Sequence, residues 1–150
     1  MPETFVKISQ NSAIRIERLR REGVQDEQLV QALEQRNPQL LQGYAAAAEL
    51  DMIAWADYAS EHGEQLKAAI QEGYQMTFNT VLGVRNWLLF ALDMEAGADY
   101  VEGEGRVDGL QLDAQQLERV RHTLAVNWVT VQQPDQTVSL MLRALAHDSM

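Results

Sequence analysis

The chain has 150 residues, carries a formal net charge of −10 at pH 7, and is 46% hydrophobic and 23% charged. This length predicts one domain, residues 1–150, that can bury a core of its own. The absence of cysteine excludes a disulfide framework, a thiol nucleophile and a zinc–thiolate site. The strong negative charge argues against non-specific binding to nucleic acid or to an anionic membrane.

The apolar segments of the sequence indicate where in the cell the protein is expected. Residues 2–7 lack the apolar run of a secretory signal. The longest apolar-rich stretch, residues 81–94, is interrupted by Arg85 and Asn86 and is too short to span a bilayer. We therefore expect a cytoplasmic protein that does not contact a membrane.

Two helices are predicted near the N-terminus. The first has one face at positions spaced three and four apart, namely Phe5, Ile8, Ser12, Ile16 and Leu19. Gly23 is a suitable stop for it, and Asp26 can cap a short second helix.

Two longer helical patterns follow. The third runs from Asn37-Pro38, a cap residue followed by proline at the first helical position, to His62-Gly63. The fourth runs from Glu64 to about Glu95. Unbroken, it would be about 45–50 Å long, whereas a compact domain of this size is about 40 Å across. It must either kink, at Gly73 or Gly83, or protrude and pair with a second copy.

Residues 87–94 of the fourth pattern are apolar on every side. Such a turn and a half must be enclosed by its own fold or by a partner chain. We therefore predict that this segment, with Trp87 and Phe90, lies in a core or in an oligomer interface.

The last third of the chain changes character at Gly97. Residues 100–101 and 106–107 predict a hairpin that turns at Gly103-Glu104-Gly105. Asp113 and Gln116 form a capping box for a further helix. Residues 126–131 and 137–142 predict a second hairpin, although residues 138–145 also fit a helical face. The predicted fold is mainly α, a helical bundle with small antiparallel hairpins in the C-terminal third; an all-α fold is the alternative.

Basic residues are concentrated at the N-terminus. Residues 1–22 carry a net charge of +2, which leaves −12 on the rest of the chain. The candidate interaction residues there are Arg15, Arg18, Arg20 and Arg21. Together with the helix predicted over residues 26–36, they fit the pattern of a helix-turn-helix. A helix followed by a hairpin near the C-terminus also fits the pattern of a winged helix. That second helix is acidic, however, so DNA binding is the lesser hypothesis, and we expect the basic helix to pack on its own protein or on a second copy.

Arg85 and Asn86 are polar residues in an apolar run. A charge there must be paired or functional. An internal ion pair with Asp51, Asp57 or Asp93 is the simpler interpretation. The alternative is a polar pocket in which Arg85, Asn86 and Asp51 recognise the carboxylate or phosphate of a ligand.

No metal site or cofactor is predicted. The acidic glycine-rich loop 99–108 lacks the ligand spacing of a calcium loop. His62, His122 and His147 are not arranged as a metal motif, although Glu118 and His122 share a helix face.

No catalytic motif is recognised in the sequence, which favours a non-enzyme. We expect a protein-interaction or regulatory protein, a homo-oligomer whose interface uses the third and fourth helices and the basic N-terminal helix. The alternatives are a DNA-associated regulator and a small-molecule or metal-binding domain.

Overall fold

The computed structural model describes residues 5–148. The N-terminal half contains two short strands and a set of helices: β1 (Val6–Ile8), α1 (Gln10–Arg21), α2 (Asp26–Gln35), the 3-10 helix η1 (Pro38–Leu41), α3 (Ala45–Glu49), α4 (Met52–Glu61), α5 (Leu66–Glu72) and β2 (Tyr74–Met76). The C-terminal half contains α6 (Val81–Leu92), β3 (Val101–Gly103), β4 (Arg106–Leu110), α7 (Ala114–Thr123), β5 (Trp128–Gln132), β6 (Val138–Leu142) and α8 (Arg143–Asp148).

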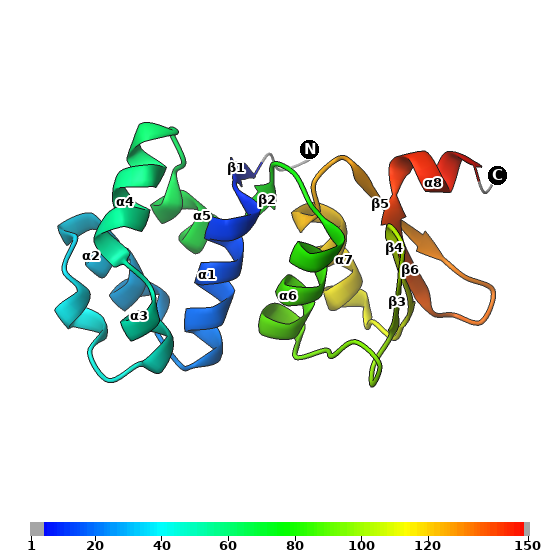
Figure 1. The fold of residues 1–150 in the computed structure, drawn as a ribbon, viewed down its shortest axis with the longest axis horizontal. Helices are drawn as coiled ribbons and strands as arrows, with labels where there is room; N and C mark the ends of the chain where they lie inside the picture. The colour runs from blue at the N-terminus through cyan, green and yellow to red at the C-terminus, as the bar shows by residue number, and fades with distance from the viewer. Residues whose placement is uncertain (1–4, 149–150) are drawn as a thin grey trace.

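The two halves lie side by side (Figure 1), and α1 and α6 meet between them. Each of these helices follows a short strand, and β1 and β2 pair in parallel, with Val6 opposite Tyr74 and Ile8 opposite Met76. The side chains of Ser9 and Thr80 cap the two helices by accepting a hydrogen bond from a backbone N–H of the first turn. Chain segments almost 70 residues apart therefore form two matching strand–helix units.

Gly83 allows α1 and α6 to approach closely. A Cβ atom added there would lie 1.8 Å from the side chain of Gln10. That side chain donates to the Thr80 hydroxyl and accepts from Asn79, which ties the start of α1 to the start of α6.

The C-terminal half is built on an antiparallel sheet with strand order β3-β4-β6-β5. One face carries the buried residues Val107, Leu140 and Trp128, which belong to the core shared with the helices. The other face carries Arg106 and Asp108, together with the valines of β5. The structure is thus mainly helical with a small antiparallel sheet, and the all-α alternative is wrong.

The prediction of one long helix over residues 64–95 is also wrong. The pattern breaks at Gly73, whose φ of +110° ends α5, and the chain continues as β2 before a new helix begins after Thr80. Gly73 was one of the two predicted kink sites, but no protruding helix of 45–50 Å exists among the described residues. The length argument for a second copy is lost with it.

Other helix boundaries also differ from the prediction. The third pattern is divided into η1, α3 and α4 by Gly43, with a φ of +99°, and by the cap at Asp51. Phe5 and Ile8 do not begin a helix, because the chain is extended until Ser9 and β1 pairs with β2. The cap of α2 is Gln25, one residue before the predicted Asp26.

The signals of the last third are confirmed. Asp113 and Gln116 form the capping box of α7. The hairpin β3–β4 turns at Glu104-Gly105, and β5–β6 turns at residues 133–137. The helical alternative for residues 138–145 holds only after Leu142, where α8 begins.

The apolar turn of α6 is only partly enclosed by its own chain. Trp87 and Leu88 are both 0% exposed, while Leu89 and Phe90 are half-buried. In the described part of the chain, no helix is both long and apolar enough to cross a membrane.

Candidate functional site

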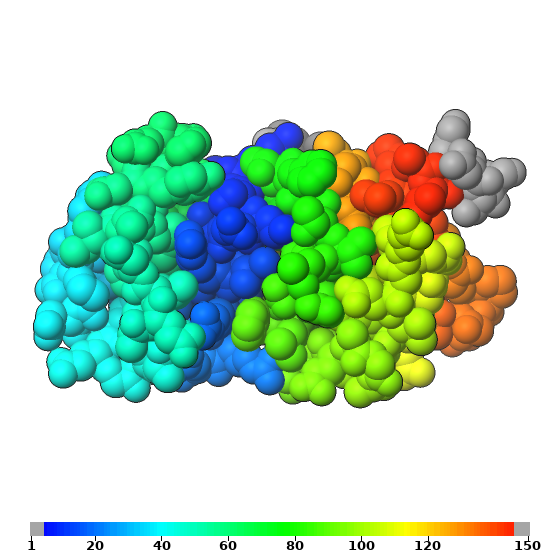
Figure 2. All heavy atoms as spheres, in the orientation of Figure 1, coloured from blue at the N-terminus to red at the C-terminus, as the bar shows by residue number. Residues whose placement is uncertain are grey.

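A hollow beside α1 brings together two residues that the sequence analysis had assigned to different roles. Arg15, an interaction candidate, and Asp51, a ligand candidate, both line it, with Asn11, Ala54, Trp55 and Tyr58. Its volume is about 330 Å³. Figure 2 shows α1 in the middle of this face, between the α3–α4 segment and α6. We call these six residues the α1 hollow.

The floor of the α1 hollow is buried and hydrogen-bonded. Trp55 is 2% exposed, and its indole N–H donates to the hydroxyl of buried Ser12 at 2.9 Å. Asp51 caps α4 by accepting from the N–H of Ala54 at 3.0 Å. The cap fixes the start of α4, and the indole hydrogen bond ties Trp55 of α4 to α1.

Arg15 lies over this floor. Its guanidinium carbon is 5.9 Å from the Trp55 ring centroid, at the outer limit of a cation–π contact. The side chain is half-buried. Among the described residues it forms no ion pair with a carboxylate.

This unpaired state sets Arg15 apart from the other cations of the described chain. Seven arginines pair with a carboxylate: Arg18, Arg20, Arg21, Arg36, Arg85, Arg106 and Arg119. The cations without an acidic partner are otherwise exposed to water: Lys7, Lys67, Arg121 and Arg143. Arg15 alone in this part of the protein combines partial burial with the lack of an acidic partner.

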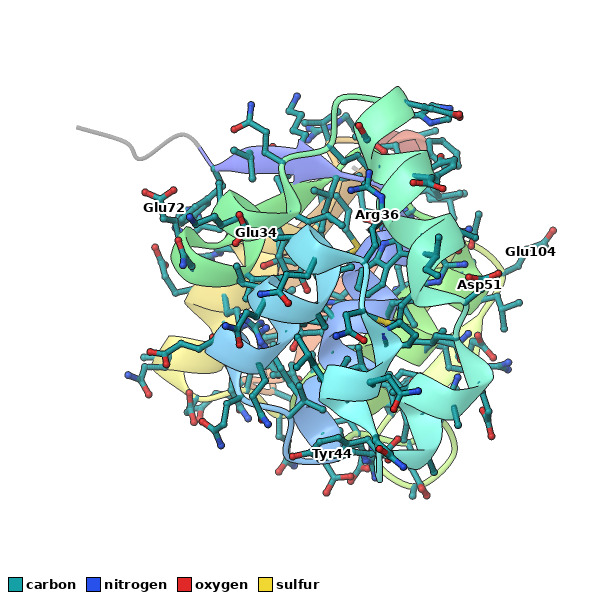
Figure 3. All side chains as sticks on the ribbon, turned by 90° about the vertical axis from the view of Figure 1, so that its left-hand side faces the viewer. Glu34, Arg36, Tyr44, Asp51, Glu72 and Glu104 are labelled. Atoms are coloured by element: carbon teal, nitrogen blue, oxygen red, sulfur yellow. The ribbon has the colours of Figure 1, made fainter. Side chains whose placement is uncertain are left out.

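The rim of the α1 hollow is accessible. Tyr58 is 42% exposed and stacks on His62 with a centroid distance of 4.0 Å. Figure 3 shows Asp51 at the edge of the helical half, on the side opposite Glu72. The α1 hollow therefore offers an unpaired guanidinium, aromatic surface and a carboxylate on its rim. It can receive a carboxylate at Arg15 and an N–H donor at Asp51.

The other basic residues of α1 contact their own chain. Arg18 pairs with Glu49, and Arg21 pairs with Asp93 at 2.8 Å and donates to the carbonyl of Leu89. Arg20 donates to Glu17, to Asp26 and to the carbonyl of Ile70. These three arginines therefore contact their own chain, which is one of the two arrangements predicted for the basic helix.

Arg85, Asn86 and Asp51 are not brought together. Arg85 lies 3.5 Å from Glu102, a partner that the sequence analysis did not consider. The predicted partners are engaged elsewhere: Asp51 caps α4, Asp57 pairs with Arg36, and Asp93 pairs with Arg21. Asn86 and Phe90 are half-buried on α6, one turn apart.

A buried network behind α1 was missed from the sequence. Glu17 is 2% exposed and accepts from Tyr74 at 2.6 Å, from Arg20 at 2.9 Å and from Arg119 at 2.8 Å. Trp87 in turn donates to the Tyr74 hydroxyl at 2.7 Å. Burial, and then the Glu17 charge, raise the pKa of Tyr74 well above its ordinary value. No local pattern marks Glu17, because Arg119 is 102 residues away.

A second concavity of about 520 Å³ lies on the open face of the sheet. Arg106 and Asp108 form a bidentate pair at 2.7 and 2.8 Å, and Ser139 donates to Asp108 at 2.6 Å. The pairing with Arg106 is the main cause of the lowered pKa of Asp108. These charges are satisfied by each other, so this groove offers a ligand less than the α1 hollow does.

Among the side chains that the structure describes, no cluster of three or more histidine or acidic residues is arranged to hold a metal ion. The chain matches no protein-family model, no curated protein and no solved structure.

Proposed function

We propose that this chain is a non-enzymatic protein-interaction or regulatory protein of the cytoplasm, that it associates with itself, and that it binds a protein partner through the α1 hollow. The observation that carries the proposal is the half-buried, unpaired Arg15 above Trp55. In this proposal the helices around α1 form a bundle, and the α1 hollow lies on its surface.

The composition of the α1 hollow suits a protein interface. Tryptophan, tyrosine and arginine are the residues that most often dominate binding energy at such interfaces, usually in pockets sheltered from water. Arg15 and Tyr58 present two of these residue types to a partner, while Trp55, 2% exposed, forms the floor beneath Arg15. A partner carboxylate at Arg15 would gain a charge-assisted hydrogen bond that the free chain does not make.

The alternatives have less support. A DNA-binding helix should present its arginines to the phosphates, but Arg18, Arg20 and Arg21 pair with acidic groups of the same chain. A small-molecule site is expected to measure about 300–1,000 Å³. The α1 hollow is at the small end of that range, so a free ligand is the second candidate, and Arg15 replaces Arg85 as its anchor.

Selection of displayed peptides on the whole chain tests the proposal. We expect the selected peptides to share an acidic residue next to an apolar one. Replacing Arg15 by glutamine should weaken their binding by about 10- to 100-fold, the value of one charged hydrogen bond. Arg121→Gln is the matched control, because Arg121 is exposed and also lacks an acidic partner among the described residues.

Equal binding by the wild type and Arg15→Gln would contradict the proposal. A labelled DNA duplex, measured at low and moderate salt, provides a separate comparison. Tight binding of the duplex that falls steeply with salt would favour the nucleic-acid alternative instead.

A further inference from the structure

The strand β5 forms one edge of the four-stranded sheet. Two backbone hydrogen bonds to the neighbouring β6 hairpin segment lie just outside the ends of β5. The N–H of Arg143 donates to the carbonyl of Asn127, and the N–H of Gln133 donates to the carbonyl of Thr137. Because backbone groups alternate along a strand, Val129 and Val131 also point their N–H and C=O toward β6. The backbone N–H and C=O groups of Thr130 and Gln132 point away from β6, at the free edge of the sheet. Within the described chain these groups have no hydrogen-bond partner.

The two edges of the sheet differ in how well they are protected. The opposite edge, β3, has three residues, and its central Glu102 is charged and tied to Arg85. Short length and charge are the usual protection of an edge strand. The β5 edge has five residues, Trp128 to Gln132, without charge, proline or glycine. It is therefore a ready template for another strand.

We propose that β5 pairs antiparallel with β5 of a second copy, about a twofold axis at Thr130, and so joins the two sheets into one. The proposal rests on the self-association in the proposed function and assigns it a surface. The predicted helical interface contributes little to this contact, because Trp87 is enclosed in its own chain.

The sequence of β5 is self-complementary about Thr130. In this register Thr130 exchanges backbone hydrogen bonds with Thr130 of the second copy, and the N–H of Gln132 donates to the carbonyl of Trp128 of the second copy, twice by symmetry. Val129 then lies opposite Val131 of the second copy on the open face of both sheets. Pairs of β-branched side chains in that position stabilise antiparallel strands.

Charge favours the same occupant. Each copy carries a net charge of −10, so two copies repel each other over most of their surfaces. The uncharged β5 edge avoids placing like charges opposite each other. Because β5 is uncharged and can pair symmetrically about Thr130, a second copy of β5 is the occupant that best fits this edge.

An engineered cysteine tests the register. The chain has no cysteine, so Thr130→Cys introduces a single thiol that would face its symmetry mate. Directly opposed residues of a hydrogen-bonded antiparallel pair have Cα atoms about 5.5 Å apart, within the range that a disulfide spans. We expect mild oxidation to give a disulfide-linked dimer in high yield, with unchanged circular dichroism.

Val101→Cys is the matched control for accidental cross-linking. Val101 is 67% exposed and lies on the opposite edge strand, whereas Thr130 is half-buried. Cross-linking by random collision would favour Val101→Cys. Faster cross-linking of Thr130→Cys at equal protein concentration therefore supports the pairing, and equal or slower cross-linking overturns it.

Light scattering of the reduced proteins separates this inference from the proposed function. We expect the wild type to form a dimer, and Val129→Lys, which places a like charge near the axis in both copies, to weaken it by at least about tenfold. A wild-type dimer that Val129→Lys leaves intact, and that Thr130→Cys does not cross-link, overturns the β5 pairing alone. A wild-type monomer at millimolar concentration overturns self-association itself.

Discussion

Replacing Glu17 by glutamine should be among the most damaging single changes on α1. Glutamine keeps the size of the side chain but removes the charge that holds Arg20 and Arg119. Removal of one member of a buried ion pair costs about 3–5 kcal/mol. The two arginine side chains are 26% and 37% exposed, and Arg20 keeps Asp26, so water and that carboxylate offset part of the loss. We expect a loss of about 2–3 kcal/mol.

Urea denaturation followed by tryptophan fluorescence measures this loss. A loss of that size corresponds to a melting temperature lower by about 5–10 °C in a domain of this length. Glu49→Gln is the matched control, because the carboxylate of Glu49 also pairs with an arginine of α1, but is 64% exposed. An exposed pair is worth about 0–1 kcal/mol. If Glu17→Gln were no more destabilising than Glu49→Gln, the buried network would not hold α1, β2 and α7 together.

Two further predictions concern the same core. Leu88→Ala should cost about 2–5 kcal/mol, and Leu89→Ala less than half as much, because Leu88 is 0% exposed and Leu89 is half-buried; equal losses in urea denaturation would contradict this packing. Burial keeps Tyr74 protonated in the fold, so above pH 10 the unfolded chain ionises first and the free energy of unfolding falls as pH rises. Tyr74→Phe should reduce this alkaline loss, and an unchanged slope between pH 9 and pH 11 would refute it.

Several local features of the fold could be predicted from the sequence. The capping box at Asp113 and Gln116, the stop at Gly23 and the turn at Gly103-Glu104-Gly105 were all correctly placed. These signals act over three or four residues, through side chains that bond to the nearest backbone groups or through glycine backbone freedom. They do not depend on what the rest of the chain does.

The candidate site shows what lies beyond such local signals. Arg15 could be picked out as one of the basic residues near the N-terminus, and Asp51 as a possible partner of Arg85. Their shared hollow requires α4 to lie beside α1, where Trp55 donates to Ser12, 43 residues away in the chain. The expected partnership of Arg85 with Asp51 was wrong for the same reason, since several carboxylates were available and only the tertiary structure places Glu102 beside Arg85.

The apolar periodicity of residues 64–95 determined that much of this segment would be helical, because a 3.6-residue repeat creates a face that must be buried. It could not show that residues 74–76 form a strand. Those residues pair with β1, which lies almost 70 residues earlier in the chain, and no local pattern reports such a partner. Local sequence determined where helices and turns begin and end. Tertiary structure decided which helical patterns break and which charges meet, because those outcomes depend on partners far away along the chain.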